Sequence, residues 1–359
     1  VARYLRTGHL VYGRGGSLHA VSFDLQQMKT KGASKLLVSG VRTESSGGAV
    51  QFAFSDDGTL VYVAGPNLAI SRFVWVDRSG EITSLGLPVR SYGEFKLSPD
   101  GKSLAVVFGD EKDDIWIYNF ERESWSRFTV EGNNQNPVWS PDGTQMAYAS
   151  LREGSGKLFR KNVDGTGVEQ QLTKFSERAW FRPDAWTHDG RYLLLRKDQK
   201  NWLLTTAEDT LKLQPHARKS DQSWFSAPSP DSHWLAYTSS DLGPWEVFVE
   251  DFPSATKRWK ISIDGGEEPR WSPDGKELYY RNRDQWFVVP ISTETGFLPG
   301  KPRLLFEGPY INVYGYSWDV HPDGQRFLAL QAEEHTNPRQ IRVVLNWFEE
   351  LKQEVPTEK

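Results

Sequence analysis

The sequence predicts an all-β protein, a β-propeller built from four-stranded antiparallel blades. A tetrapeptide of the Ser-Pro-Asp-Gly type recurs along the whole chain at intervals of 42 to 50 residues. Short apolar runs flank each copy, and aromatic residues, which suit pleated and half-buried surfaces, make up 13% of the 359 residues. A repeat of about 40–45 residues with four strands has the size of one propeller blade.

The tetrapeptide marks the repeats. Identical copies occupy residues 98–101, 140–143 and 272–275, and looser copies occupy 55–58, 187–190, 229–232 and 321–324. A degenerate eighth copy is 5–8, because residues 8–12 match 58–62. Eight copies predict eight blades, and a seven-bladed ring with the first repeat as an appendage is the alternative.

The chemistry of the tetrapeptide predicts a tight turn between two antiparallel strands. Proline presets φ at the first central position, aspartate accepts a hydrogen bond from the backbone two residues on, and glycine tolerates a positive φ. The Asp recurs in nearly every repeat, so we interpret it as a turn cap and not as half of a catalytic carboxylate pair.

Four short strands are expected in each repeat, as residues 95–97, 104–107, 115–118 and 126–129 illustrate. The first is the most apolar and should lie nearest the axis of the ring, and the fourth is the most polar and should lie at the rim. The last repeat supplies only three clear strands, so its fourth is either absent or contributed from elsewhere. We expect one propeller domain over residues 1–347 and a polar C-terminal tail over 348–359, either a short helix or disordered.

Charge and hydropathy limit the partners. Lys and Arg total 43 against 47 Asp and Glu, without a basic stripe, which argues against nucleic acid as a partner. No apolar run approaches the ~20 residues of a membrane helix, so we expect no membrane insertion by this segment. The chain starts at Val1 without an apolar leader, which we interpret as a fragment or a processed chain.

Catalytic motifs are not evident. The sequence has no cysteine, no G-x-S-x-G elbow and no close pairing among its seven histidines, so we expect no catalytic residue, no metal and no cofactor. Binding of a protein or a small-molecule ligand is therefore the expected function. The alternative is an enzyme, a lyase or hydrolase, that uses a metal or polar site at the mouth of the propeller channel.

The tetrapeptide turn, the aromatic residue before it and the polar Leu-Thr ending of the repeats resemble the WD40-like repeats of TolB-type propellers. Segments 2–12, 55–62, 303–310 and 344–352 are more specifically similar to the C-terminal propeller region of bacterial serine/threonine protein kinases. That resemblance implies a sensor or interaction role and an extracytoplasmic, periplasmic location, with the cytoplasm as the alternative. The kinase motifs themselves are missing, so kinase activity does not carry over.

The connections between successive repeats carry the candidate binding residues. They should gather at one mouth of the channel, and their contents differ from repeat to repeat, unlike the turns. Aromatic, amide and charged groups that converge on a concavity favour recognition. A second interpretation is that they cover the ends of the core and fill the channel. The candidates are Asn134, Gln135, Trp180, Arg182, Trp224, Phe225, Glu267, Glu268, Asn312 and Tyr314.

Overall fold

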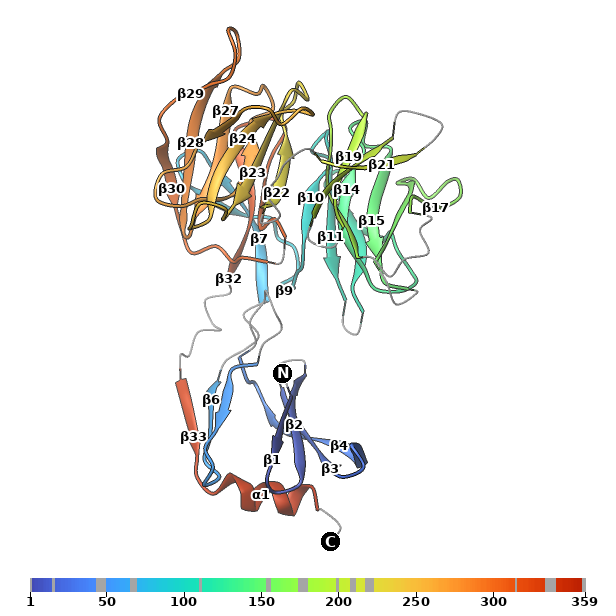
Figure 1. The fold of residues 1–359 in the computed structure, drawn as a ribbon, viewed down its shortest axis with the longest axis vertical. Helices are drawn as coiled ribbons and strands as arrows, with labels where there is room; N and C mark the ends of the chain where they lie inside the picture. Colours follow the sequence, from blue (N-terminus) through green and yellow to red (C-terminus); the bar gives the residue numbers. More distant parts are fainter. Residues whose placement is uncertain are drawn as a thin grey trace.

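The protein is almost entirely β-strand (Figure 1). The computed structural model describes residues 2–14, 17–42, 50–64, 70–109, 112–152, 156–173, 180–197, 200–206, 211–216, 223–313, 315–332 and 340–356.

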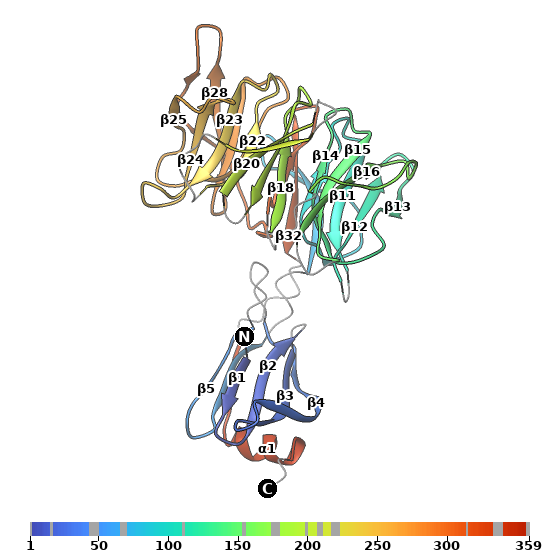
Figure 2. The same ribbon diagram turned by 45° about the vertical axis from the view of Figure 1, so that its right-hand side comes forward.

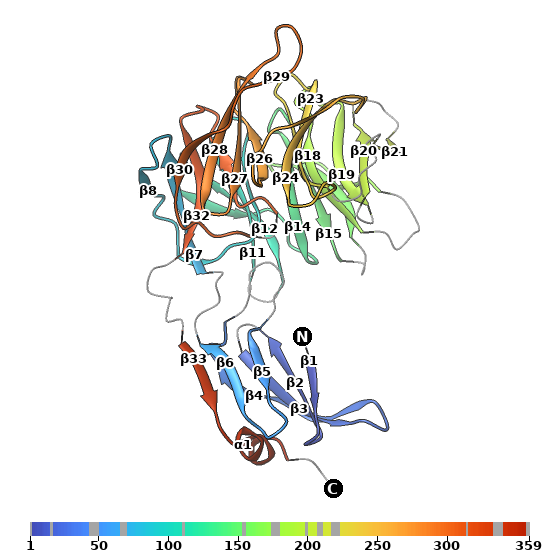
Figure 3. The same ribbon diagram turned by 60° about the vertical axis from the view of Figure 1, so that its left-hand side comes forward.

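Six antiparallel sheets form a closed ring. Figures 1 and 3 show this ring from the side, as the upper group of strands. Neighbouring innermost strands contact one another around the ring, and the last contacts the first again. In ring order these strands are β10 (Phe95–Leu97), β14 (Asn134–Trp139), β18 (Phe181–Trp186), β22 (Ser223–Pro228), β26 (Glu267–Trp271) and β31 (Trp318–Val320). The all-β propeller predicted from the sequence is therefore confirmed.

Five of the sheets run outward in chain order from their innermost strand. The first continues through β11 (Ser103–Phe108), β12 (Asp114–Asn119) and β13 (Ser124–Arg127). The second continues through β15 (Gln145–Ser150), β16 (Lys157–Asn162) and β17 (Gln170–Gln171). The third continues through β19 (Tyr192–Lys197), β20 (Lys200–Thr205) and β21 (Lys212–Pro215). The fourth continues through β23 (Trp234–Ser239), β24 (Glu246–Asp251) and β25 (Arg258–Lys260). The fifth continues through β27 (Glu277–Asn282) and β28 (Gln285–Ser292), and both β29 (Leu298–Pro299) and β30 (Arg303–Glu307) pair with β28.

The sixth sheet closes the ring with strands from both ends of the chain. Strands β31 and β32 (Arg326–Ala332) come from the C-terminal part, and β7 (Ile70–Asp77) and β8 (Ile82–Ser84) come from the N-terminal part. β32 pairs with β7 in an unbroken antiparallel register, and β9 (Arg90–Ser91) also pairs with β7. The third and fourth places of the last blade are thus filled from elsewhere in the chain, by β7 and β8.

The remaining strands form two further sheets that lie apart from the ring (Figure 2). One contains β1 (Ala2–Leu5), β2 (His9–Arg14), β3 (Ser17–Asp24) and β4 (Lys29–Ser39). The other contains β5 (Phe52–Phe54), β6 (Leu60–Ala64) and β33 (Gln340–Val344). Helix α1 (Trp347–Glu354) packs on these sheets, because Trp347 and Leu351 lie one turn apart on the face that enters their shared core.

The prediction of eight blades in one ring differs from this arrangement. Eight repeats do give eight sheets, but only six close the ring among the described residues. The reason is an exchange of strands between the second and the last repeat. β6 of the second repeat pairs with β33 of the last, whereas β32 of the last pairs with β7 of the second. A repeat seen in sequence does not specify whether its third strand pairs within the repeat or with another one.

The tetrapeptide turns have the predicted geometry. In the turn at 140–143, Ser140 Oγ donates to Asp142 Oδ1 over 2.5 Å and accepts from the Gln145 N–H over 2.9 Å. Gly143 has φ +70°, the left-handed region that glycine tolerates. A Cβ on Gly143 would lie 3.6 Å from Cδ of Pro99, in the turn of the preceding blade. Adjacent turns therefore pack against each other around one end of the ring.

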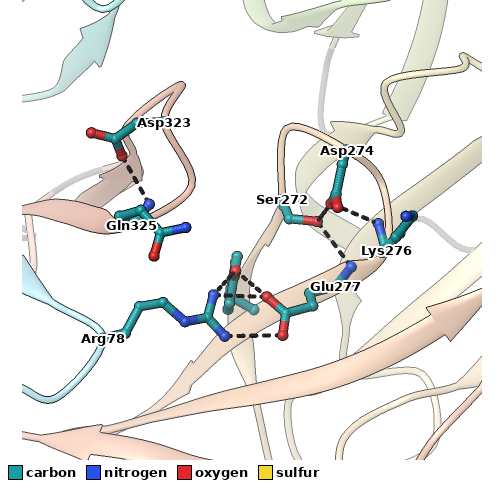
Figure 4. Close-up of polar contacts among 8 residues, drawn as sticks. Arg78, Ser272, Asp274, Lys276, Glu277, Asp323 and Gln325 are labelled. Carbon is teal, nitrogen blue, oxygen red and sulfur yellow. Dashed lines mark hydrogen bonds and ion pairs between the residues drawn. The ribbon is translucent and has the colours of Figure 1, made fainter.

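An arginine at the closing blade joins it to the fifth blade (Figure 4). Arg78, which follows β7, donates from Nη1 and Nη2 to the two carboxylate oxygens of Glu277 on β27, over 2.8 and 3.0 Å. Nη1 also donates to the hydroxyl of Tyr279 over 2.6 Å. This hydrogen bonding from Arg78 lowers the pKa of Glu277, against the opposing effect of partial burial.

Replacing Arg78 by methionine should lower the free energy of unfolding by about 1 kcal/mol at neutral pH, the upper part of the range for partly exposed ion pairs. Because the folded-state pKa of Glu277 lies below its ordinary 4.5, the pair stabilises the fold above that pH and loses its effect as the pH falls through the lowered value. Denaturant titrations should thus show the full difference in unfolding free energy between wild type and Arg78→Met at pH 7, and a smaller difference at acidic pH.

Lys102→Met provides the control, since its ion pair with Glu121 is solvent-exposed on both sides. This variant should match the wild type at every pH. An Arg78→Met penalty that does not change with pH would contradict the assigned pairing.

The central channel as candidate functional site

A funnel opens on the axis of the ring at the end where the tetrapeptide turns lie. Its volume is about 380 Å³, in the lower part of the range for small-molecule pockets. Each of the six blades contributes the second residue of its turn to the rim. These residues are Pro99, Pro141, His188, Pro230, Pro273 and Pro322. Because proline rings fix φ and the turns pack on one another, the rim is a rigid frame.

The floor of the funnel is divided into two halves. Each blade contributes the residue two positions before its turn. On three consecutive blades, those of β26, β31 and β10, these residues are Arg270, Asp319 and Lys96. On the other three blades, those of β14, β18 and β22, they are Val138, Ala185 and Ala227. At this position the funnel floor is charged on three blades and apolar on the other three, and Asp184 of β18 adds a carboxylate to the lining.

The charged half is arranged around one tyrosine ring. The Arg270 guanidinium lies 3.4 Å from the ring centroid of Tyr316, and Lys96 Nζ lies 4.1 Å from the same centroid. Arg270 also pairs with Asp319, with 3.4 Å between Nε and Oδ1. Burial, reinforced by the neighbouring Arg270, lowers the pKa of Lys96 to about 7. The ammonium of Lys96 therefore titrates near neutral pH, unlike an ordinary surface lysine.

A buried polar cluster narrows the channel beyond the funnel floor. Glu94 accepts a hydrogen bond from Asn136 Nδ2 over 2.6 Å and pairs with Arg182 over 3.4 Å. Arg182 Nε lies 3.7 Å from the carboxylate of Asp184. Burial raises the pKa of Glu94, and Arg182 opposes that effect. The cavity enclosed here is about 20 Å³, space for about one water molecule, so the cluster separates the two mouths.

The structure places three of the predicted candidates inside the channel. Arg182 belongs to the polar cluster, and Phe225, at φ +59°, packs edge-on against Tyr316 with 5.0 Å between ring centroids. Glu268 is buried and accepts hydrogen bonds from the backbone N–H and the hydroxyl of Ser317. Trp224 lies beneath the Arg196 guanidinium, 3.6 Å from the ring centroid.

Two amide candidates belong to the first strand of the second blade. Asn134 is buried and donates to the carboxylate of Asp114 over 3.1 Å, and Gln135 donates to Asp113 over 2.9 Å. Their amides are thus held by two aspartates at and just before the start of β12 in the neighbouring blade.

The other candidates lie at the surface or outside the described residues. Trp180, Glu267 and Asn312 are exposed, Trp180 by 45%. Tyr314 lies outside the described residues. The structure thus brings some of the ten candidates into the channel and leaves others on the surface.

Sequence reasoning missed the funnel floor. Lys96, Arg270 and Asp319 lie in the short strands that precede the turns and belong to no recognised motif. A signal was available, because a charged residue two positions before the turn breaks the apolar pattern in three of the six ring repeats. Alternation of strand faces predicts that this position points to the axis.

The described residues contain no group of three or more His, Asp or Glu side chains placed to hold a metal ion. The same residues include no helix that is long and apolar enough to cross a membrane.

Comparison with known proteins agrees with the fold. Residues 78–216 match the family model described as the TolB beta propeller domain. A sequence relative, an uncharacterized protein of Agrobacterium fabrum, is 23% identical over 245 residues, 63% of this chain and 82% of the relative. Residues 78–216 are therefore similar to the TolB propeller domain.

Two solved structures of TolB proteins are among those similar to this chain. A protein described as TolB from Agrobacterium tumefaciens superposes with a TM-score of 0.54 at 18% identity, covering 74% of this chain and 98% of that one. TolB from Acinetobacter baumannii gives a TM-score of 0.48 at 16% identity, covering 82% and 80%. At these identities the first similarity establishes the fold alone.

Replacing Arg182 by methionine should destabilise the protein by about 3–5 kcal/mol, because Glu94 and Asp184 would keep buried charge without their cation. Trp180 lies two residues before Arg182 and is 45% exposed, so Trp180→Ala should lower the free energy of unfolding by less than about 1 kcal/mol. Chemical denaturation of both variants measures the difference. Equal, small effects would mean that the polar cluster does not hold the channel as described.

Proposed function

We propose that this protein is a non-catalytic recognition module that binds its ligand in the funnel at the turn end of the propeller channel. The observation that carries the proposal is the divided floor: three charged side chains face three apolar ones across a cavity of about 380 Å³. Such a combination of apolar wall and few polar groups is typical of small-molecule sites.

The rigidity of the frame supports binding. The rim consists of tight turns that contact one another, so the site needs little rearrangement to accept a ligand, and a preorganised site loses less conformational entropy on association. The buried polar cluster closes the funnel at its base, which makes it a pocket and not a pore.

The cellular role belongs to the same proposal. We place the protein outside the cytoplasm, as the ligand-binding part of a kinase-type receptor or as a TolB-like periplasmic protein. The support is the similarity of segments 2–12, 55–62, 303–310 and 344–352 to the propeller region of bacterial receptor-type kinases. The opposite mouth, with Trp180 and Asn312 at its surface, would then be available to a protein partner.

An enzyme that uses the channel is the competing function. The partly neutral Lys96 at the funnel floor is the observation that favours it, because a lysine with a lowered pKa is also a nucleophile or a base.

A ligand-observed NMR screen with a mixture of small acids, amines, alcohols and amino acids tests the proposal. Ala185 is half-buried and lines the apolar side of the funnel, so Ala185→Phe should fill the cavity. Ala53→Phe makes the same change on an exposed position of β5, outside the ring. We expect compounds that bind the wild type and Ala53→Phe, lose binding in Ala185→Phe, and are recovered chemically unchanged.

Two results would overturn the proposal. Binding that survives in Ala185→Phe would move the site away from the funnel. Conversion of a compound by the wild type but not by Ala185→Phe would make the protein an enzyme.

A further inference from the structure

We infer that the funnel takes small monocarboxylates with an apolar body, with the carboxylate on Lys96 and the body against Val138, Ala185 and Ala227. This inference rests on the proposed function, because it names the ligand class for the same funnel.

Lys96 is the side chain that favours an anionic ligand. Its Nζ makes no hydrogen bond or ion pair with any residue that the structure describes, and its contact is with the face of the Tyr316 ring, 4.1 Å from the centroid. A half-buried ammonium that makes no direct ion pair is unfavourable even with carboxylates nearby, and a bound carboxylate would supply the missing hydrogen bonds.

The acidic groups of the channel are already engaged, which argues against a cationic ligand. Glu94 pairs with Arg182 and Asn136, and Asp184 also lies against Arg182. Asp319 pairs with Arg270 and accepts the Leu97 N–H over 3.0 Å. An ammonium ligand would have to displace one of these pairs, whereas a carboxylate would add a partner to Lys96.

The apolar half determines what the carboxylate is attached to. Val138, Ala185 and Ala227 lie on three consecutive blades opposite the charged half, and Trp139, Trp186 and Trp271 also line the funnel. These side chains offer no charge to a ligand, and Asp184, which also lines this side, lies 3.7 Å from Arg182 Nε, so burial of a hydrocarbon chain is the interaction that this side favours. One carboxylate at one end of an apolar body fits both halves.

Ligand binding should be linked to proton uptake. The groups that face Lys96 are Glu94 beside β10, Asp184 on β18, Arg270 on β26, and Tyr316 and Asp319 at β31. Burial and Arg270 lower the pKa of Lys96 to about 7 in the free protein. A bound carboxylate favours the charged form, so affinity should be full below that pH and decline as the pH rises above it.

Isothermal titration calorimetry with hexanoate, hexan-1-ol and hexylammonium tests the inference. We expect hexanoate to bind the wild type about tenfold more tightly than hexanol, the size of one charged hydrogen bond. Hexylammonium should bind most weakly. Hexanoate affinity should fall between about pH 6 and pH 9, with proton uptake visible as a dependence of the heat on the buffer.

Lys96→Met removes the charge and keeps the apolar stem, so it should fold and still bind hexanol. We expect this variant to bind hexanoate about tenfold more weakly than the wild type does. We also expect its affinity for hexanoate to no longer depend on pH. Lys276→Met, at an exposed lysine just after a turn, should leave binding unchanged.

The outcomes separate the two proposals. The carboxylate inference would be overturned if hexanoate bound no more tightly than hexanol, or if Lys96→Met left hexanoate binding unchanged. The funnel would remain the site if Ala185→Phe still abolished the binding of hexanol. Hexanoate binding that persists in Ala185→Phe would overturn both. An absence of binding by every probe would overturn the carboxylate inference, and the wider screen would decide the function of the funnel.

Discussion

The pairing of β7 with β32 is the contact on which the rest of the structure depends. It joins residues 71–77 to residues 326–332, so the ring closes only when the two ends of the chain meet. The same two repeats pair a second time through β6 and β33, and this pairing removes β5 and β6 from the ring. Building one blade from both parts of the chain joins them through the backbone hydrogen bonds of a single sheet. One exchange of strands thus sets both the six-membered ring and the separate pair of sheets.

Ring size in turn determines the channel. Six innermost strands bring their turns so close that a Cβ on Gly143 would contact Pro99 of the turn before, and a Cβ on Gly275 would contact Pro230. Inside this frame the side chains fill the axis unevenly. The Glu94–Arg182–Asp184 cluster occupies the middle, and the space that remains is the funnel above Lys96, Arg270 and Asp319. The candidate site is therefore a product of closure, with residues from every blade.

Local features were predictable from the sequence because local chemistry determines them. The turn at 140–143 forms as its residues dictate, with the positive φ on Gly143 and the cap from Ser140 and Asp142. Strand partners across the ring were not predictable, since β7 is compatible with either neighbour until closure selects β32. The same limit applies to the site. Sequence analysis identified Arg182 as a residue of the channel mouth, but not as the buried cation that pairs with Glu94. It missed Lys96, because the position of Lys96 in the site depends on Tyr316, 220 residues away in sequence.

Disulfide cross-linking tests the strand exchange most directly, because the chain has no cysteine of its own. Arg72 on β7 and Gln331 on β32 are direct partners in the register, so the double variant Arg72→Cys/Gln331→Cys should form a disulfide under mild oxidation. In a ring in which the second repeat keeps its own strands, β7 would pair with β6, and Val61→Cys/Arg72→Cys would form the cross-link instead. The account predicts a bond between positions 72 and 331 and none between 61 and 72, and the reverse result would contradict it.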